Sequence, residues 1–388
     1  MKVLIYAHAF APQVGGAETY VMHLARGLAD GLGSEVCEVI VATSTPADGY
    51  DDSLLPFRVV RQPSAAALWR LIGWADVVQL AGPAFVPLFL AVLRGRPIVI
   101  EHHGYQAVCP NGLLFLEPHK QICPGYFMTR RYHRCVRCVG TTEGLPRAFL
   151  KVLLTFPRRW LCGRAAVNVA ITRHVARRIA LPRTEVIYHG VPMSTPSSSE
   201  PQLGDRPFTF AYVGRLVSEK GIPVLLEAAR VLREEGRPFR LQVIGDGPER
   251  SSLEQQCVAL GVSDFVEFTG FLSGQALDEA LGDVQAVVMP SIWEETAGLA
   301  AMEHMMRGRL VIAAAIGGLA EIVGDAGLTF EAGESQGLVA CMRRVLNDPS
   351  VAQVFGRRAR ERAERLFRVD RMVEEHMSFY RRVTAGKT

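Results

Sequence analysis

Two glutamates, Glu295 and Glu303, flank an expected helix start and could bind hydroxyl groups of a phosphorylated ligand. The apolar run 284–289 predicts a strand that ends at Pro290, and a helix is expected to begin near Gly298. A helix start leaves unpaired backbone N–H groups and a positive dipole end, so it favours a phosphate. Acidic residues near a helix N-terminus are also stabilising without a ligand, so this stretch alone leaves both interpretations open.

Two cations, Arg215 and Lys220, follow a second expected strand over residues 208–213. Gly214 provides a turn between that strand and the cations. Two cations five residues apart at the end of a strand could straddle a diphosphate. The pattern therefore indicates a second phosphate-binding element.

Gly15 and Gly16 lie between the first expected strand and a helix over residues 17–31, where paired glycines let the backbone approach an anion closely. His103 follows an expected strand over residues 98–101 and could hydrogen bond or polarise a substrate hydroxyl. A tight turn and a structural histidine explain these same residues when each segment is judged alone.

Four cysteines cluster within 30 residues in the order C-x13-C-x11-C-x2-C: Cys109, Cys123, Cys135 and Cys138. A C-x2-C pair is typical of tetrahedral zinc sites. The short apolar run at the N-terminus indicates a strand rather than a signal peptide, so we expect a cytoplasmic, reducing environment that disfavours disulfides. A structural zinc is the leading interpretation and metal-free thiols are the alternative, whereas a closed four-ligand site disfavours a catalytic metal.

Strands and helices alternate along most of the 388 residues, which predicts an α/β protein of two domains with doubly wound parallel sheets. The polar run 192–206 is expected to link the two halves. In such sheets, ligands bind at the carboxyl ends of the strands, where the glycine, histidine, cation and glutamate motifs lie.

Positive charge is concentrated in the first half, which holds 21 Lys and Arg against 12 Asp and Glu in residues 1–195. Between Lys120 and Arg183 there are 14 basic residues and one acid. Trp160 lies there among apolar and basic residues at helical spacing, a pattern that suits either an anionic membrane surface or packing within the domain. No nucleic-acid-binding motif accompanies the charge, so nucleic acid is not expected as a partner.

Together these motifs resemble the glycosyltransferases of family 4, which have the GT-B architecture of two Rossmann-like domains facing across a cleft. The resemblance covers nearly the whole chain. It rests on the following motifs in order: Gly15 to Glu18, His103, Gly214-Arg215 with Glu219 to Gly221, Gly245 to Pro248, the E-x7-E pair Glu295 and Glu303, and Gly317-Gly318 with Glu321.

The resemblance implies retaining transfer of a hexose-type sugar from a nucleotide-diphosphate-sugar, without a catalytic metal. Arg215 and Lys220 would hold the diphosphate, Glu303 the ribose, Glu295 the donor sugar, and His103 would contact that sugar near the reacting carbon. The backbone that completes the donor site would come from Gly15, Gly16, Gly214, Gly245, Thr296, Ala297, Gly298 and Leu299.

By this resemblance, residues 1–195 form an acceptor-side domain with a cysteine-rich insertion at about 105–142, and residues 196–369 form the donor domain. Residues 370–388 would form a helix that crosses back to the first domain. We expect UDP or GDP as the nucleotide and a glycan or lipid-linked acceptor, in cell-surface polysaccharide or glycolipid synthesis, with the protein peripheral on the inner face of the cytoplasmic membrane. A nucleotide-sugar 2-epimerase of GT-B shape and a non-catalytic nucleotide-sugar binder are the alternatives.

Overall fold

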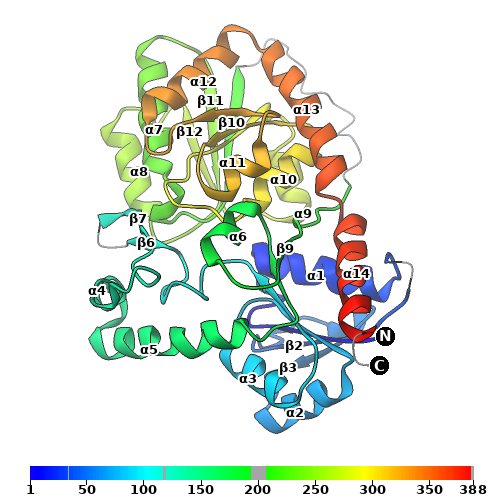
Figure 1. Cartoon of the computed structure of the whole chain (residues 1–388). Coiled ribbons are helices and arrows are strands. Elements are labelled where there is room, and N and C mark those ends of the chain that lie inside the picture. Colours follow the sequence, from blue (N-terminus) through cyan, green and yellow to red (C-terminus); the bar gives the residue numbers. More distant parts are fainter. Residues whose placement is uncertain (34, 117–118, 194–206, 386–388) are drawn as a thin grey trace. The chain divides into compact units, whose positions relative to one another are not determined.

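Two parallel sheets, each covered by helices on both faces, organise the chain in a computed structural model that describes residues 1–33, 35–116, 119–193 and 207–385 (Figure 1). The chain divides into unit 1, residues 1–119, 123–191 and 367–388, and unit 2, residues 120–122 and 192–366. This arrangement confirms the expected fold class of two doubly wound α/β domains. Residues 194–206 of the expected linker lie outside the described residues.

Unit 1 is built on a seven-stranded sheet in the order β3-β2-β1-β4-β5-β8-β9. The strands are β1 (Lys2–Ala7), β2 (Glu38–Thr43), β3 (Arg58–Arg61), β4 (Val77–Leu80), β5 (Ile98–His102), β8 (Val167–Ala170) and β9 (Thr184–Val186). The helices are α1 (Gly16–Ala29), α2 (Ala65–Trp74), α3 (Phe85–Leu93), α4 (Tyr132–Glu143), α5 (Leu145–Cys162), α6 (Arg173–Ile179) and α14 (Val369–Ala385). The cysteine-containing segment also has two short strands, β6 (Phe115–Leu116) in unit 1 and β7 (Gln121–Ile122), whose residues fall in unit 2.

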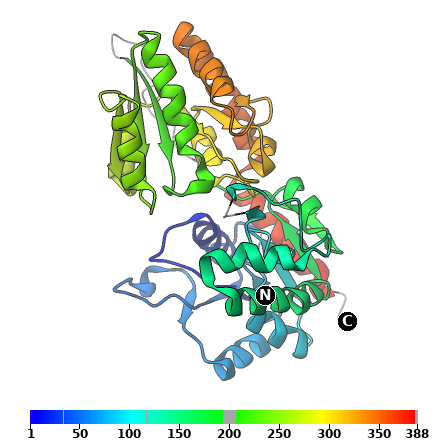
Figure 2. The ribbon, with the colours of Figure 1, turned by 90° about the vertical axis from the view of Figure 1, so that its left-hand side faces the viewer.

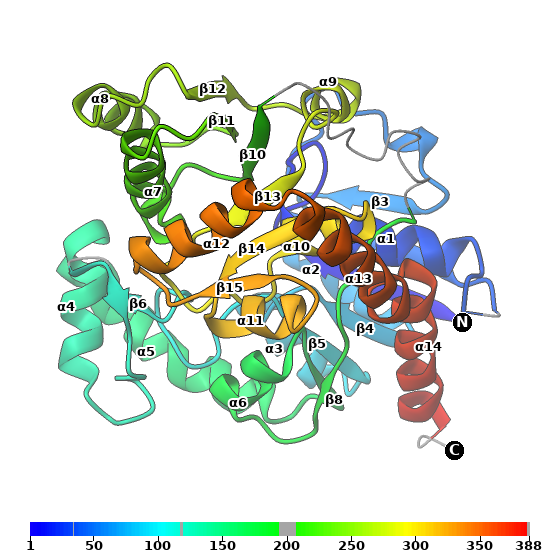
Figure 3. The same ribbon diagram turned by 90° about the horizontal axis from the view of Figure 1, so that it is seen from above.

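Unit 2 has a six-stranded sheet in the order β12-β11-β10-β13-β14-β15, which Figure 3 shows from above. Its strands are β10 (Phe208–Val213), β11 (Phe239–Ile244), β12 (Val266–Gly270), β13 (Ala286–Met289), β14 (Leu310–Ala314) and β15 (Leu328–Phe330). Its helices are α7 (Ile222–Glu234), α8 (Arg250–Ala259), α9 (Gly274–Ala280), α10 (Leu299–Met306), α11 (Gly317–Val323), α12 (Ser335–Asn347) and α13 (Ser350–Leu366).

The central strands are apolar along their length because both faces of each sheet are covered. In β14 every residue is buried, and in β1 only Lys2 is exposed. Helix α1 buries Tyr20, Leu24 and Leu28, which recur every four residues on one face. The same periodicities that predicted these elements therefore supply the two apolar cores.

The last helix of the chain, α14, belongs to unit 1 and packs against α1. Its buried residues Met372, Val373 and Met377 join the same apolar core as β1 and α1. None of the helices within the described residues combines the length and the apolar content needed to cross a bilayer.

The apolar residues in the stretch 186–191 predict a last strand there, but the last strand of unit 1, β9, runs over Thr184–Val186, so this prediction is wrong. The chain leaves the sheet after Val186 because Gly190 packs directly against the backbone of Val369, where a Cβ would lie 2.5 Å from the Val369 Cα. The departure carries His189 into the buried interior of unit 1.

Candidate functional site

In unit 2, the loop between β13 and α10 places a buried carboxylate against a lysine. The Nζ of Lys220 donates a hydrogen bond of 2.5 Å to Oε1 of Glu295, and the hydroxyl of Ser291 donates to the same oxygen at 2.7 Å. Helix α10 begins directly after Gly298, whose φ of 89° lies in the left-handed region. The strand, the loop and the helix start follow the predicted pattern, so an ion pair lies close in sequence to a helix N-terminus.

The charge on Glu295 is maintained by its partners. Burial alone would raise the pKa of this carboxyl, but the ammonium of Lys220 and the hydrogen bonds from Lys220 and Ser291 outweigh it and lower the pKa below its ordinary value. Lys220 also lies over the ring of Trp293, with Nζ 5.8 Å from the ring centre. Glu295 is therefore an anion at neutral pH.

Two glycines allow the segments around this pair to approach each other. A Cβ on Gly221 would lie 2.1 Å from the carbonyl oxygen of Pro290, and a Cβ on Gly317 would lie 2.6 Å from the carbonyl oxygen of Glu295. Both glycines have positive φ, and the N–H of Gly318 donates to the Glu295 carbonyl at 2.6 Å. The glycines after Lys220 and before α11 thus fix the backbone that carries the ion pair.

Arg215 does not join the buried pair. Its side chain is 72% exposed, against 18% for Lys220, and its nearest carboxylate is Glu219 at 3.8 Å. The loop that carries Arg215 is held because Gly214 and Gly245 pack backbone to backbone, where a Cβ on Gly245 would lie 1.9 Å from the Gly214 carbonyl oxygen. The two predicted cations therefore differ in depth, and Arg215 is free to turn toward a ligand.

Glu303 lies about one turn inside α10 and is half-buried. Burial raises the pKa of this carboxyl, and the nearby charge of Arg307 only partly offsets the rise. Between the two glutamates, Thr296 and Ala297 are buried and Leu299 is half-buried. The E-x7-E motif thus holds one carboxylate that is paired and one whose proton is retained to higher pH.

In unit 1, Gly16 begins α1 and Gly15 caps it without a side-chain hydrogen bond. The carboxylate of Glu18 folds back over the cap, because a Cβ on Gly15 would lie 2.4 Å from its Oε2. The predicted helix start after the paired glycines is present, and its dipole is met by an acidic residue of its own first turn.

His103 lies just after β5, among aromatic rings. The ring of Tyr20 meets it edge-on at 4.7 Å between centroids, and the ring of His189 lies 5.0 Å away. Burial lowers the pKa of His103 to about 4, although the charge of Glu101 opposes the shift. His103 is therefore a neutral imidazole at pH 7, and among the described residues neither ring nitrogen has a hydrogen-bond partner.

The neighbouring His102 has a different role. It is the last residue of β5, fully buried, and its Nε2 lies 2.9 Å from Oδ1 of Asn168 on the adjacent strand β8. Burial lowers the pKa of His102 as well. This histidine holds two strands together, so of the two adjacent histidines His103 is the one available to a ligand.

A buried polar network that the sequence reasoning missed lies beside His103. The phenol of Tyr20 donates to Oε2 of Glu101 at 2.9 Å, and Nε2 of His376 lies 3.0 Å from that phenol and 3.2 Å from the carboxylate. Nδ1 of His376 faces the Met372 carbonyl at 2.7 Å. The only local signal was a glutamate inside an apolar strand. The network ties α14, α1 and β5 together within unit 1.

The four cysteines of the insertion are all buried, and two of them are linked by one amide. The thiol of Cys109 donates to Oδ1 of Asn111 at 2.8 Å, and Nδ2 of Asn111 lies 3.8 Å from the Cys138 sulfur. Burial, followed by the neighbouring cysteines, raises the pKa of Cys135 to about 12. Burial also raises the pKa of Cys109 to about 11, so these two thiols are protonated at neutral pH.

As described, this cysteine group does not form a metal site. Cys135 and Cys138 lie one turn apart on α4 instead of on the turn typical of a zinc knuckle. Within residues 1–33, 35–116, 119–193 and 207–385, no three His, Cys, Asp or Glu side chains are arranged to hold a metal ion. Four thiols suit zinc by type but not by this arrangement, and the expected structural zinc stays a prediction.

Comparison with known proteins assigns both halves of the chain. Residues 14–195 match the family model described as Glycosyltransferase Family 4, and residues 195–362 match the one described as Glycosyl transferases group 1. The 2-deoxystreptamine glucosyltransferase of Streptomyces kanamyceticus is 30% identical over 251 residues, 60% of this chain and 64% of that protein. The 2-deoxystreptamine N-acetyl-D-glucosaminyltransferase of Streptomyces fradiae is 29% identical over 328 residues, 80% of this chain and 77% of that protein.

A solved structure of Anabaena Alr3699/HepE in complex with UDP and glucose has a TM-score of 0.72 and 20% identity, and it covers 97% of this chain and 98% of its own. At this identity the likeness shows the fold. This chain matches less than two thirds of the length of the first curated relatives. The two family models follow one another from residue 14 to residue 362, and the chain belongs to the glycosyltransferases of the family 4 type.

Proposed function

We propose that the protein is a retaining glycosyltransferase that moves a hexose-type sugar from a nucleotide-diphosphate-sugar to a glycan or lipid-linked acceptor, without a catalytic metal. The observation that carries this proposal is the buried pair of Lys220 and Glu295 in the loop before α10. Such a pair near a helix start can bind both parts of the donor. The cation attracts the negatively charged diphosphate, and the carboxylate accepts hydrogen bonds from the sugar hydroxyls.

Lys220 has the role of receiving the leaving nucleoside diphosphate. As the bond to the sugar breaks, negative charge grows on the phosphate oxygens, and a preorganised ammonium stabilises that charge. The exposed Arg215 adds a second cation once its side chain turns inward, and the N–H groups at the start of α10 add the helix dipole. The sequence contains no Asp-x-Asp triplet, so these groups are the ones assigned to the diphosphate.

The two glutamates have separate roles. Glu295 accepts hydrogen bonds from hydroxyls of the transferred sugar, and Glu303 binds the ribose of the nucleotide. The structural neighbour solved with UDP and glucose supports a uridine donor, and GDP is the other nucleotide that we consider. His103 is the group of unit 1 that contacts the sugar, because its uncharged ring nitrogens are without hydrogen-bond partners among the described residues.

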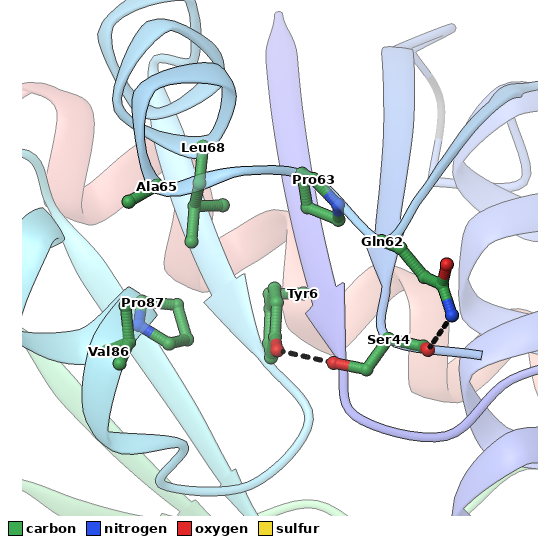
Figure 4. Close-up of a pocket in the computed structure, with 8 residues that line it drawn as sticks. All are labelled: Tyr6, Ser44, Gln62, Pro63, Ala65, Leu68, Val86 and Pro87. Atoms are coloured by element: carbon green, nitrogen blue, oxygen red, sulfur yellow. Dashed lines mark hydrogen bonds between the residues drawn. The ribbon is translucent and has the colours of Figure 1, made fainter. Parts of the chain in front are cut away.

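The acceptor is assigned to a pocket of about 260 Å³ in unit 1, at the carboxyl ends of β1, β2 and β3 (Figure 4). The Tyr6 hydroxyl and the Ser44 hydroxyl lie 3.0 Å apart, and the Gln62 amide donates to the Ser44 carbonyl at 3.5 Å. Its lining is Tyr6, Ser44, Gln62, Pro63, Ala65, Leu68, Val86 and Pro87.

None of these eight lining residues carries a charge. Two relatives are named for 2-deoxystreptamine, which is a diamine, and a cationic acceptor calls for carboxylates. Hydroxyls and an amide above an aliphatic floor instead suit an uncharged sugar ring. We therefore propose an uncharged glycan, free or lipid-linked, as the acceptor class.

A donor panel tests the proposal. Thermal shift with UDP-, GDP-, ADP- and dTDP-sugars identifies the nucleotide, and transfer is then measured with the stabilising donor. Lys220→Met and Glu295→Gln should abolish transfer, while Glu235→Gln, which alters an exposed carboxylate paired with Arg343, should not. Stabilisation by no donor would refute the proposal, and formation of an epimer from donor alone would identify an isomerase.

A second measurement addresses the acceptor. Ser44→Val with Gln62→Leu should raise the acceptor KM and leave the donor-induced thermal shift unchanged. Faster transfer to an aminocyclitol than to a neutral sugar would contradict the assignment of the pocket to an uncharged acceptor.

A further inference from the structure

Helix α5 of unit 1 presents large apolar side chains to solvent along its length. Six of them are between 42% and 66% exposed: Leu145, Phe149, Leu150, Leu153, Phe156 and Trp160. Five of the six recur at intervals of three or four residues, so they form one stripe along the helix. A contiguous exposed stripe of this kind marks an interaction surface rather than an ordinary solvated helix face.

The ring of Phe156 also contacts Phe127 and Tyr132, but packing within unit 1 does not account for the other five residues of this stripe. Helix α5 already has a second, buried side, on which Ala148, Val152, Thr155 and Leu161 contact the rest of the unit. A helix that only needs to cover a core has a single apolar side. The exposed side of α5 is therefore additional to the side that folding requires.

A neighbouring helix widens the surface. Helix α3 contacts α5, and it exposes Val86, Phe89 and Leu93 at 44% to 60%. These three residues are again spaced by three and four positions. Figure 1 shows α3 beside α5, and Figure 2 shows α4 alongside α5. We call the exposed apolar residues of α3 and α5 the α3–α5 face.

Positive charge lies on and next to α5, beside the α3–α5 face. The side chains of Arg134 and Arg137 are exposed on α4, next to α5, as is that of Arg131 just before α4. Arg147 is exposed on α5 itself. The one acid between residues 120 and 183, Glu143, is paired with Lys151 at 2.5 Å. The surface therefore combines aliphatic and aromatic side chains with an uncompensated cationic rim.

Trp160 and Arg164 show this combination at the end of the stripe. The Arg164 guanidinium lies 4.2 Å from the centre of the Trp160 ring. An aromatic ring with a cation above it is suited to the boundary between acyl chains and headgroups, where one end is apolar and the other contacts anions.

We propose that the α3–α5 face docks onto an anionic lipid bilayer, with α5 lying in the plane of the interface and its aromatic and leucine side chains inserted between the headgroups. Charge complementarity selects this occupant. The arginines of α4 and α5 attract anionic headgroups, and the apolar stripe provides the insertion that charge alone does not supply. A second copy of this chain would bring an identical cationic rim, so like charges would oppose a self-paired face.

The proposal does not depend on sugar transfer, and it bears on the acceptor only through one residue. Val86 belongs to the α3–α5 face and also lines the pocket assigned to the acceptor. If the proposed function holds, a docked face places that pocket beside the lipid surface, which favours a lipid-linked acceptor over a free glycan.

Flotation with vesicles tests the docking. The full chain is mixed with vesicles of phosphatidylcholine alone or with 30% phosphatidylglycerol, and the bound fraction is measured at low and high salt. We expect at least tenfold more binding to the anionic vesicles and a decrease with salt. A triple variant, Phe149→Ser with Leu153→Ser and Trp160→Ser, should bind the anionic vesicles at least tenfold less than the parent does.

A matched control replaces equally exposed apolar residues elsewhere. Val258 and Phe271, in unit 2, are 73% and 60% exposed, and Val258→Ser with Phe271→Ser should bind vesicles as the parent does. Circular dichroism and the melting temperature check the fold of both variants, and transfer to a water-soluble acceptor should be unchanged in both, which separates this proposal from the proposed function.

Equal vesicle binding by the triple variant and the parent, or no binding by the parent, would overturn the proposal. Loss of a concentration-dependent dimer in the triple variant, without vesicle binding by the parent, would instead assign the face to a second copy. Binding that depends only on salt and not on the apolar residues would limit the interaction to charge and refute insertion.

Discussion

Lys220 and Glu295 form a buried ion pair with 2.5 Å between Nζ and Oε1, although 75 residues separate them in the sequence. The pair is linked to the backbone of its own unit by the bond from the Ile292 N–H to the Glu219 carbonyl at 3.0 Å. Each residue of the pair therefore stabilises the charge that the other needs for donor binding.

A double-mutant cycle separates the structural and the chemical roles of this pair. Lys220→Met leaves a buried carboxylate without its cation, which should cost about 3 kcal/mol of unfolding free energy. Lys220→Met with Glu295→Gln removes both charges, so urea unfolding should recover most of that stability while transfer stays at least about 100-fold below the parent. Recovery of transfer together with stability would show that the pair is only structural.

The close approach of Gly317 to Glu295 gives a second prediction. Gly317→Ala places a Cβ 2.6 Å from the Glu295 carbonyl oxygen at a φ of +60°, so the backbone of Glu295 must move. Gly333→Ala is the matched control, because its φ is +83° but no atom lies within 4 Å of the added Cβ.

Both variants carry the same backbone strain, which should cost about 1 kcal/mol measured by urea unfolding. Only Gly317→Ala should cost more than this and lower transfer. Equal losses of stability and of transfer in the two variants would mean that the contact with Glu295 has no functional consequence.

Local patterns were sufficient to predict the fold class and the order of the elements. Alternating apolar segments predicted the two parallel sheets, and the strand, loop and helix around Glu295 and Glu303 follow the expected order. One strand was wrongly predicted because the chain there responds to distant residues: the strand expected over residues 186–191 is replaced by packing against α14. The Cys135–Cys138 pair lies on a helix, and its metal content stays a prediction.

The interior of unit 1 could not be predicted because its polar contacts join remote residues. Tyr20, Glu101 and His376 meet in one network, and no spacing rule relates residues 20, 101 and 376. For Arg215, the sequence predicted the position in the chain but not the environment of the side chain. Its position after a strand was predicted from the sequence, but the exposure of its side chain depends on the three-dimensional structure.

The low pKa of His103 predicts a pH profile. Its pKa is about 4 because of burial, so kcat/KM should show no acid limb from this group between pH 5.5 and 8. His103→Ala should lower kcat/KM about 100-fold, while His133→Ala, at an exposed position on α4, should not. An acid limb near pH 6.5 that disappears in His103→Ala would contradict a neutral, buried imidazole.

The same buried histidines predict the direction in which the unfolding free energy changes with pH. His103 and His189 have lowered pKa values in the folded protein, so the unfolded chain binds protons first as the pH falls below about 6.5. The unfolding free energy, measured by urea unfolding, should therefore have its full value above pH 6.5 and should decrease as the pH is lowered toward 4. His189→Gln should reduce that decrease, and an unchanged slope would exclude His189 as a cause.

The four cysteines give a prediction about metal content. If they bind zinc after rearrangement, elemental analysis should find about one zinc per chain, and Cys135→Ser with Cys138→Ser should lower the melting temperature without changing donor binding. Cys341→Ser, at a half-exposed cysteine of unit 2, is the control. A metal-free preparation with full stability would refute the structural zinc and leave four buried thiols.

The raised pKa of Glu303 predicts a conflict between stability and donor binding. Because the folded protein holds this proton more tightly than the unfolded chain, unfolding free energy is lost as the pH rises through the carboxyl range, and at pH 7 the ionised carboxylate destabilises the fold. Glu303→Gln should therefore raise the melting temperature at pH 7 and have little effect near pH 4.

The same change should raise the donor KM about tenfold, because one charged hydrogen bond to the ribose is replaced by a neutral one. Glu234→Gln, at an exposed carboxylate of α7, is the control and should change neither quantity in this direction. A lower melting temperature for Glu303→Gln at pH 7 would show that the carboxylate is stabilised in the folded protein and that its pKa is not raised.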